Sequence, residues 1–287
     1  MKKIIMTIAV LAVAGMAANA TELFVGRTDG LNEFSYAETA GANNDYTPNG
    51  WAGFAPSVTG VAADSGGGVH VAHTTGLSHF SWNGTAFTAD GYVGWTGGAT
   101  GVAIASDGTI ITTQGGGMNA WTYTGSGYTS VPGGGDGTGY IGFAGARDLT
   151  IDAAGYIHVL HDGGLSAFTQ SGGALTAVAG GYHGGIVNGN SILADGSGNI
   201  FAARDSGINA ITFNGSSYGL GGWWGIGSTD LAVSSDGTLF ATMTGVGQLT
   251  SVTYNGANFT QTGYVGMPGA AAVFVDSEDN IHLGKGD

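Results

Sequence analysis

The chain contains no cysteine, which excludes disulfide bonds and thiolate metal ligands. Positive charge is also scarce, because 6 Lys and Arg stand against 20 Asp and Glu in 287 residues and give a formal net charge of −14 at pH 7. An acidic surface repels nucleic acids and anionic lipids, so neither is expected as a partner. After the amino terminus, no apolar run reaches the roughly 18 residues that a membrane-spanning helix needs, so no membrane insertion is expected.

Several motifs of known catalytic and ion-binding sites are missing too. The sequence has no H-E-x-x-H zinc motif, no G-x-x-x-x-G-K-[ST] phosphate-binding loop and no EF-hand loop. The apolar residues show no sustained helical periodicity in any segment, which favours an all-β fold. These absences leave enzymatic activity open but favour a binding function.

The first twenty residues have the pattern of an export signal. Lys2 and Lys3 precede an apolar stretch, and Ala18-Asn19-Ala20 fits a signal-peptidase site. We therefore expect residues 1–20 to be a signal peptide and residues 21–287 to form one domain. The protein is expected to be periplasmic or extracellular in a Gram-negative bacterium. Loss of the two lysines leaves 4 basic residues against 20 acidic ones, a net charge of −16.

An internal repeat dominates the rest of the chain. Each copy reads as an apolar strand, a polar turn and a second strand, followed by a third strand, a turn and a fourth strand. The turn after the third strand is Asn-Gly in three copies, at Asn83, Asn214 and Asn255, and predicts two-residue hairpins. Six segments align without gaps from residues 60, 101, 148, 191, 230 and 272: GVAADSGGGVHVAH, GVAIASDGTIITTQ, DLTIDAAGYIHVLH, SILADGSGNIFAAR, DLAVSSDGTLFATM and AVFVDSEDNIHLGK.

Four strands per repeat of 39 to 47 residues predict a six-bladed β-propeller of four-stranded antiparallel blades. Six connectors of the form Gly-aromatic-x-Gly, or close to it, support six blades. The amino-terminal unit lacks a first strand and the carboxyl-terminal unit stops after its second. We therefore expect pairing of the N- and C-terminal strands to close the ring. The second strand has seven copies, so seven blades stay open as an alternative.

The segments TGVAADSGGGVHVAH and TDLAVSSDGTLFATM resemble the NHL-repeat type of six-bladed β-propeller. The resemblance covers essentially the whole chain after residue 20, although the proline usual before the first strand and the strict terminal Asp are absent. It implies a propeller with a central channel. It implies no particular activity, because this fold hosts binding proteins, lactonases, lyases and scaffolds.

Most of the remaining basic residues fall at the end of the second strand, a position expected near the mouth of the channel. A ring of cations on an acidic protein attracts an anionic group. Pairing with neighbouring acids such as Asp162 explains the same residues without a ligand. The predicted ligand-binding residues, here called the mouth set, are Arg27, His73, Gln114, Arg147, His161, Arg204 and Lys285.

Oxygen ligands recur near the start of the first strand. Asp148, Asn190 and Asp230 could hold a divalent cation at the channel, as in propellers of the gluconolactonase type. Those enzymes also use a glutamate there, and none of the four glutamates of this chain falls in the inner-strand position. Asp at the start of a strand also satisfies N–H groups of loops, which is the structural alternative.

Aromatic residues recur in the connectors. Exposed rings at the rim of the mouth would suit stacking against sugars, whereas rings wedged between blades explain the same regularity without a ligand, and the wedge is the preferred interpretation. The first aromatic residues of the six connectors are Trp51, Tyr92, Tyr140, Tyr182, Trp223 and Tyr264.

These features together predict an exported ligand-binding or interaction propeller that recognises an anionic or carbohydrate group at the channel mouth. One alternative is a metal-dependent lactonase or hydrolase at the central channel. Another is a surface scaffold that binds a second surface protein and has no small-molecule site. No cofactor is expected, and a divalent metal stays open for the lactonase alternative.

Overall fold

The computed structural model describes residues 10–13, 21–27, 29–37, 45–53, 57–64, 66–132, 139–172, 174–243, 245–275, 279 and 281–285. Every regular element in these ranges is a β-strand, as the lack of helical periodicity predicted. No helix in these ranges is long and apolar enough to cross a membrane.

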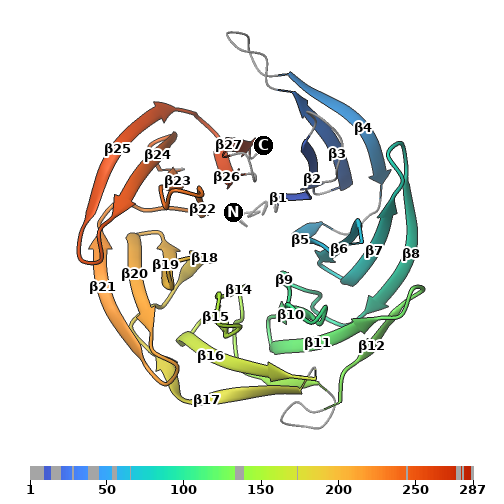
Figure 1. Cartoon of the computed structure of the whole chain (residues 1–287), viewed down its shortest axis with the longest axis horizontal. Coiled ribbons are helices and arrows are strands. Elements are labelled where there is room, and N and C mark those ends of the chain that lie inside the picture. Colours follow the sequence, from blue (N-terminus) through green and yellow to red (C-terminus); the bar gives the residue numbers. More distant parts are fainter. Residues whose placement is uncertain are drawn as a thin grey trace.

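The strands form seven antiparallel sheets that follow one another around a ring (Figure 1). The first sheet contains β1 (Val10–Val13), β2 (Thr21–Arg27), β3 (Gly30–Ala37) and β4 (Asp45–Gly53). The second contains β5 (Val58–Ala63), β6 (Gly68–His73), β7 (Gly76–Trp82) and β8 (Phe87–Gly94). The third contains β9 (Gly101–Ile104), β10 (Ile110–Gln114), β11 (Gly117–Tyr123), β12 (Tyr128–Ser130) and β13 (Tyr140–Gly142).

The fourth sheet contains β14 (Asp148–Ile151), β15 (Ile157–His161), β16 (Gly164–Ser171) and β17 (Ala174–His183). The fifth contains β18 (Gly189–Ala194), β19 (Asn199–Arg204), β20 (Gly207–Phe213) and β21 (Tyr218–Trp224). The sixth contains β22 (Asp230–Val233), β23 (Leu239–Met243), β24 (Gln248–Tyr254) and β25 (Phe259–Gly266). The seventh contains β26 (Ala270–Val275) and β27 (Ile281–Lys285).

The first strand of each sheet lies nearest the centre of the ring (Figure 1). In chain order, β1, β5, β9, β14, β18, β22 and β26 each contact the next, and β26 contacts β1. Inner strands around a common centre, with mostly four-stranded antiparallel sheets radiating outward, define a β-propeller. The predicted fold is therefore confirmed.

The predicted count of six blades is not confirmed. The seven copies of the second strand, β2, β6, β10, β15, β19, β23 and β27, each lie in a different sheet. Among the described strands, β27 pairs only with β26, so the expected closure between the terminal strands is not formed. The reason is that β1, from the segment expected to be a signal peptide, pairs with β2 and covers the edge that the closure requires.

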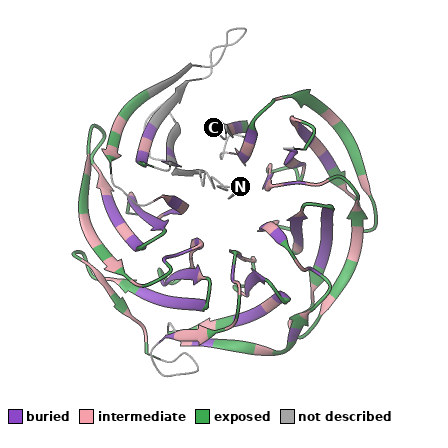
Figure 2. Cartoon of the chain, turned by 180° about the vertical axis from the view of Figure 1, so that it is seen from behind, coloured by how far each residue is buried: buried purple, intermediate pink, exposed green. Residues whose placement is uncertain are grey.

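The hydrophobic core lies between neighbouring sheets. Ile111 and Met118 of the third sheet, for example, pack in one cluster with Leu149, Ile157 and Val159 of the fourth. Figure 2 shows buried residues in the inner and middle strands and exposed residues along the outermost strands. The middle strands β6 and β15 are buried along their whole length because sheets cover both of their faces.

Aspartates fix the turns between first and second strands. Asp195 Oδ1 accepts hydrogen bonds from the backbone N–H groups of Ser197 and Asn199, at 2.8 Å each. The second oxygen, Oδ2, accepts a hydrogen bond from Asn199 Nδ2 at 2.7 Å. The contacts of Oδ1 form an Asx turn, and Oδ2 stays available to a side chain of the following strand.

The Asn-Gly segments form four-residue loops, so the prediction of two-residue hairpins is wrong. β7 ends at Trp82 and β8 begins at Phe87. Asn83 Oδ1 accepts hydrogen bonds from the N–H groups of Thr85 and Ala86, at 3.0 and 2.9 Å. The side chain thereby supplies the acceptor that widens the turn.

Side chains at the start of the first strands, or just before them, join neighbouring sheets. Each donates a hydrogen bond to a backbone carbonyl just before the first strand of the next sheet or within it. The donor and acceptor residues are Thr59 and Ala99, Thr100 and Ala146, Asn190 and Ser228, and Thr229 and Ala271, at 2.8, 3.0, 2.9 and 3.4 Å.

Candidate functional site

The ends of the second strands and the starts of the first strands lie at one end of the sheets, as predicted. Val58 at the start of β5 pairs with His73 at the end of β6. The loops between sheets return to the same end, since the N–H of Ala99 donates to the carbonyl of His73 at 2.9 Å. We call this end the mouth face. The turns between first and second strands lie on the opposite face.

His73 and His161 lie buried beneath the mouth face and are uncharged at pH 7. His73 Nε2 lies 2.9 Å from Ser78 Oγ, and the N–H of Thr75 donates to Nδ1 at 3.4 Å, which requires a lone pair on that nitrogen. His161 repeats both contacts in its own sheet. Burial lowers the pKa of His73 to about 4 and also lowers the pKa of His161.

The other described members of the mouth set add little free charge. Arg147 forms an exposed ion pair with Asp162, with Nη2 2.7 Å from Oδ1, and Gln114 is neutral. Arg204 takes part in none of the ion pairs among the described residues. The side chains of Arg27 and Lys285 lie outside the described residues. The described part of the mouth set therefore does not form a ring of cations.

The first aromatic residues of the connectors are largely exposed. The wedge interpretation is therefore wrong for them. Tyr140 is half-buried. The other five rings, Trp51, Tyr92, Tyr182, Trp223 and Tyr264, are 47% to 71% exposed.

Three of these rings pair with a polar residue at the end of a second strand. Tyr92 stacks on His73, with ring centroids 5.9 Å apart and planes 6° apart. Tyr182 stacks on His161 at 6.1 Å and 25°. The guanidinium carbon of Arg204 lies 5.6 Å from the centroid of a Trp223 ring. We call these three the aromatic–polar pairs.

Hydrogen bonds and a glycine fix the exposed rings. The hydroxyl of Tyr182 donates to the carbonyl of Gly163 in the turn between β15 and β16, at 2.8 Å. Trp223 lies over Gly207, where an added Cβ would stand 2.6 Å from the indole ring. The rings therefore present their outer surface in one orientation, which lowers the entropy lost on binding a ligand.

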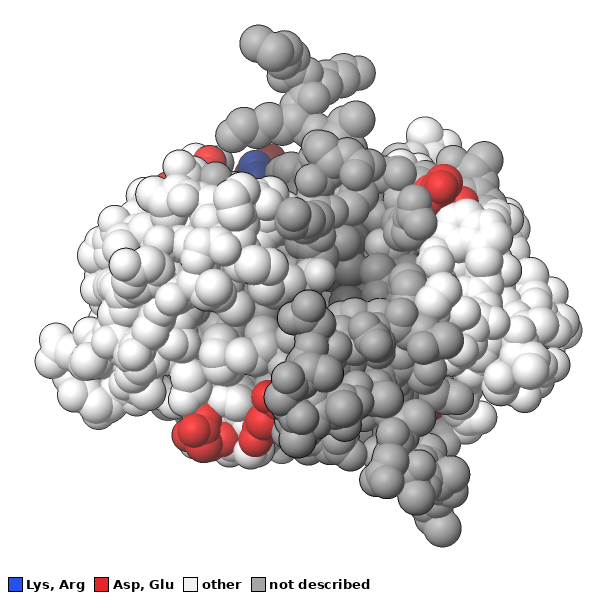
Figure 3. All heavy atoms as spheres, turned by 90° about the horizontal axis from the view of Figure 1, so that it is seen from above, with Lys and Arg blue, Asp and Glu red and all other residues white. Residues whose placement is uncertain are grey.

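The second aromatic residue of the connectors does pack into the core. Trp95 stacks on Trp121 with centroids 5.3 Å apart, and Phe143 stacks on Phe168 at 5.5 Å. The connector at residues 91–95 thus combines an exposed ring, Tyr92, with a ring packed on the core, Trp95. On the side drawn in Figure 3, charged residues are few and lie near the upper and lower edges, and most of the described surface is uncharged.

The predicted inner-strand oxygen ligands are not gathered into one set. Asn190 Nδ2 donates to Asp205 Oδ1 and to the carbonyl of Ser228, both at 2.9 Å. Ser191, at the equivalent position of β18, is close enough to both Asp148 and Asp230 to influence the pKa of each carboxyl group. Sequence reasoning missed Ser191, although it occupies the same repeat position as the two aspartates.

Asp148 and Asp230 bond to the backbone of neighbouring inner strands. Asp148 Oδ2 accepts the N–H of Ile192 at 2.9 Å, and Asp230 Oδ2 accepts the N–H of Val273 at 3.0 Å. Burial raises the pKa of Asp148 to about 6 and that of Asp230 to about 7. These contacts fit the alternative that both aspartates satisfy backbone N–H groups rather than bind a metal.

The opposite face carries two features that the sequence did not predict. A hollow of about 420 Å³ lies between the turns of the third and fourth sheets, lined by Ser106, Asp152, Tyr156 and Gln170 among others. Separately, Asp64, His70 and His79 bring three metal-binding atoms within 4.8 Å of one another. They come from a turn and two paired strands, so no linear motif marks them.

No protein-family model matches the chain, and no curated protein matches it. Solved structures with similar folds do exist. The chain is similar to the periplasmic gluconolactonase of Pseudomonas aeruginosa, with a TM-score of 0.71, 11% identity, and coverage of 91% of this chain and 85% of the other. It is also similar to a putative 6-phosphogluconolactonase of Bacteroides uniformis, with a TM-score of 0.69, 16% identity, and coverage of 90% of this chain and 85% of the other. A streptogramin B lyase is similar too, with a TM-score of 0.65, 11% identity, and coverage of 98% of this chain and 91% of the other. At these identities the likeness shows the β-propeller fold alone.

Proposed function

We propose that the protein is an exported carbohydrate-binding β-propeller whose mouth face presents aromatic–polar pairs to sugar rings. The observation that carries this proposal is the repetition of the pairs in three sheets, with the outer surface of each aromatic ring exposed. Exposed aromatic surface beside polar groups is typical of ligand-binding sites. Three similar sites on one molecule would bind a polymer more tightly than a single sugar.

The charge of the mouth face favours a neutral carbohydrate over an anion. His73 and His161 are uncharged at pH 7, and Arg147 is paired with Asp162. A net charge of −14 on the whole chain repels polyanions at a distance. Arg204 beside Trp223 can still donate hydrogen bonds to sugar hydroxyls.

Affinity electrophoresis in native gels tests this proposal. Gels contain xyloglucan, galactomannan or, as the anionic comparison, polygalacturonate. We expect a neutral polysaccharide to retard the protein, and the Tyr92→Ala, Tyr182→Ala, Trp223→Ala triple variant to lose most of the retardation. Leu220→Ala is the matched control, because Leu220 is 61% exposed but belongs to no pair. Retardation by polygalacturonate alone would favour an anionic ligand, and no retardation by any would favour a scaffold that binds another protein.

A metal-dependent lactonase is the second candidate. It is supported by the carboxyl groups of Asp148 and Asp230 on the inner strands, and by the similar folds of a gluconolactonase and a putative 6-phosphogluconolactonase. Hydrolysis of gluconolactone and 6-phosphogluconolactone is measured with EDTA and with added Ca²⁺, Mn²⁺ or Zn²⁺. Metal-dependent turnover that Asp148→Asn and Asp230→Asn abolish would establish this candidate, and equal rates with and without enzyme would remove it.

A further inference from the structure

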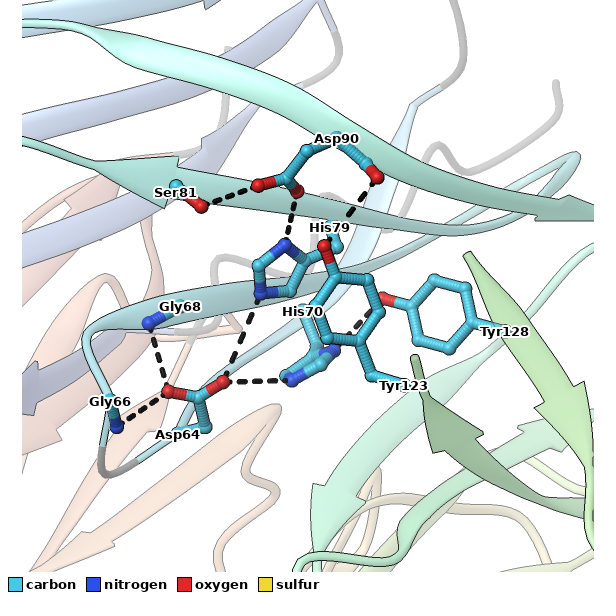
Figure 4. Close-up of polar contacts among 9 residues, drawn as sticks. All are labelled: Asp64, Gly66, Gly68, His70, His79, Ser81, Asp90, Tyr123 and Tyr128. Atoms are coloured by element: carbon cyan, nitrogen blue, oxygen red, sulfur yellow. Dashed lines mark hydrogen bonds and ion pairs between the residues drawn. The ribbon is translucent and has the colours of Figure 1, made fainter. Parts of the chain in front are cut away.

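A buried cluster on the opposite face, in the second sheet, has the donor atoms of a transition-metal site (Figure 4). Asp64 lies in the turn between β5 and β6, His70 on β6, and His79 opposite His70 on β7. The side chains of His70 and His79 are 2% and 4% exposed, and that of Asp64 is 30% exposed. The cluster is therefore enclosed by protein but open to solvent through the carboxylate.

One oxygen of Asp64 faces the outward nitrogens of both histidines at distances longer than a usual hydrogen bond. Asp64 Oδ2 lies 3.4 Å from His70 Nε2 and 3.8 Å from His79 Nε2. His79 Nε2 is buried and has no hydrogen-bond partner among the described residues. Ligands about 2.1 Å from a tetrahedral Zn²⁺ are separated by about 3.4 Å, which matches the Asp64–His70 distance. The three atoms together lie within 4.8 Å of one another, so binding an ion would draw the side chains slightly closer.

Partners on the far side of each ring orient the two histidines. His79 Nδ1 bonds to the carboxylate of Asp90, and Ser81 Oγ donates to the other oxygen of that carboxylate at 2.5 Å. His70 Nδ1 lies 2.8 Å from the hydroxyl of Tyr128. A carboxylate on Nδ1 holds the proton there and leaves the lone pair on Nε2, which is the usual arrangement of metal-binding histidines.

The fourth sheet offers an internal comparison, because the equivalent cluster there contains one histidine, His158. Asp152 Oδ2 lies 2.9 Å from His158 Nε2, a normal hydrogen bond, and His158 Nδ1 lies 2.8 Å from the Tyr218 hydroxyl. Ala167 stands opposite His158, where the second sheet has His79. The second sheet thus has an additional imidazole, and its Asp–His contact is longer by half an ångström.

Space for an ion depends on Gly68. A Cβ at this position would lie 2.3 Å from His79 Nε2 and 2.5 Å from Asp64 Oδ2. The corresponding residues of the other five aligned repeats carry side chains: Thr109, Tyr156, Asn199, Thr238 and Asn280. In the fifth sheet, Asn199 donates to Asp195 Oδ2, the oxygen that corresponds to Asp64 Oδ2. Gly68 has no side chain that could donate to Asp64 Oδ2 in this way.

We propose that Asp64 Oδ2, His70 Nε2 and His79 Nε2 bind one Zn²⁺ ion, with water as the fourth ligand. Two imidazoles and one carboxylate suit this ion, and a water position left open to solvent gives it an entry path. The bound ion would join the turn between β5 and β6 to both middle strands of the sheet. This site is separate from the aromatic–polar pairs of the mouth face.

Isothermal titration of zinc chloride into metal-free protein without a histidine tag tests the proposal. We expect one Zn²⁺ per chain and a zinc-dependent rise in Tm. His79→Ala, which reproduces the arrangement of the fourth sheet, should abolish both. Gly68→Asn should abolish binding by placing an amide on Asp64 Oδ2, and it uses the residue found naturally in the fifth sheet. Asp90→Asn should weaken binding about 10- to 100-fold by freeing the ring of His79.

Two controls keep the result interpretable. Asp152→Asn changes the matching turn of the fourth sheet and should leave zinc binding intact. Circular dichroism and Tm without zinc show whether each variant folds, so a loss of binding in folded Gly68→Asn protein supports the site. A Co²⁺-loaded sample should show visible d–d absorption of a tetrahedral ion that His79→Ala lacks. Absence of zinc binding in the unmutated protein, or equal binding in His79→Ala and Gly68→Asn, would overturn the proposal.

Discussion

At the scale of single residues, the sequence predicts where a buried titratable group lies better than it predicts whether that group is charged. The sequence places His73 and His161 at the channel mouth, and the structure does so too. The sequence could not predict that backbone N–H groups donate to Nδ1 and keep both rings neutral. Likewise, the repeat alignment marks Asp148 and Asp230, but the raised pKa of each depends on burial, which only the packed inner strands create.

The pH dependence of stability should reveal Asp230. Its pKa is about 7 in the folded protein and 3.8 in an exposed carboxyl, and the like charge of Asp148 contributes to this rise after burial. Between these values the unfolded chain loses the proton first, so the contribution of Asp230 to stability falls as pH rises from about 4 to about 7. Asp230→Asn keeps an acceptor for the N–H of Val273 and cannot ionise. Its Tm relative to the unmutated protein should therefore increase over this range.

Asp236 supplies a control of opposite sign. Hydrogen bonds from Ser234 and Thr238 lower the pKa of this exposed carboxyl, so its stabilising contribution is present above the unfolded pKa and is lost as pH falls. Asp236→Asn should lose Tm relative to the unmutated protein as pH rises from about 3 to 5. Thermal unfolding followed by circular dichroism at unit pH steps measures both variants. Parallel curves for Asp230→Asn and the unmutated protein would contradict the assignment.

At the scale of elements, the four-strand unit could be read from the sequence because alternation and turn residues recur in every copy. In the aromatic connectors, however, the sequence pattern does not predict which side chain is buried. The pattern Gly-Tyr-Val-Gly-Trp at residues 91–95 does not say which ring is buried. In the structure, the hydroxyl of Tyr92 bonds to the turn carbonyl of Thr75 while Trp95 stacks on Trp121. The sequence did not predict the proposed zinc site of Asp64, His70 and His79 for a related reason, because the pairing of His70 with His79 depends on strand register.

Removal of a hydrogen bond between neighbouring sheets should lower stability without changing ligand binding. Thr59 Oγ1 donates to the carbonyl of Ala99 at 2.8 Å in a half-buried position. Thr59→Val keeps the shape and leaves this carbonyl without its donor, which should cost about 1–3 kcal/mol of unfolding free energy. Urea unfolding measures the change, and Thr85→Val, in an exposed loop, is the control. Retardation by polysaccharides should be unaffected, whereas a stability equal to that of the unmutated protein would show that the bond contributes nothing.

At the scale of the whole molecule, the number of sheets and the closure of the ring depend on which strand lies innermost in the first sheet. Residues 10–13, Val-Leu-Ala-Val, share Leu-Ala-Val with β22 but lack its initial Asp, and the segment after them contains no Asp or Ser, so the repeat does not predict β1. In the structure, β1 pairs with β2 and contacts β5 and β26. The same four residues lie in the apolar stretch that the sequence predicts to be part of a cleaved signal.

Cleavage of the predicted signal peptide would have a structural consequence that can be measured. We expect the complete sequence, expressed in a Gram-negative host, to be recovered from the periplasm with Thr21 as its first residue, because Ala18-Asn19-Ala20 fits a signal-peptidase site. Cleavage there removes β1 and leaves β2 with one free edge in the first sheet. Intact-mass spectrometry of the periplasmic and cytoplasmic fractions identifies the first residue. Ala18→Lys with Ala20→Lys should block cleavage and retain residues 1–20. Recovery of unmutated protein beginning at Met1 in the cytoplasm would instead make β1 a permanent strand of the ring.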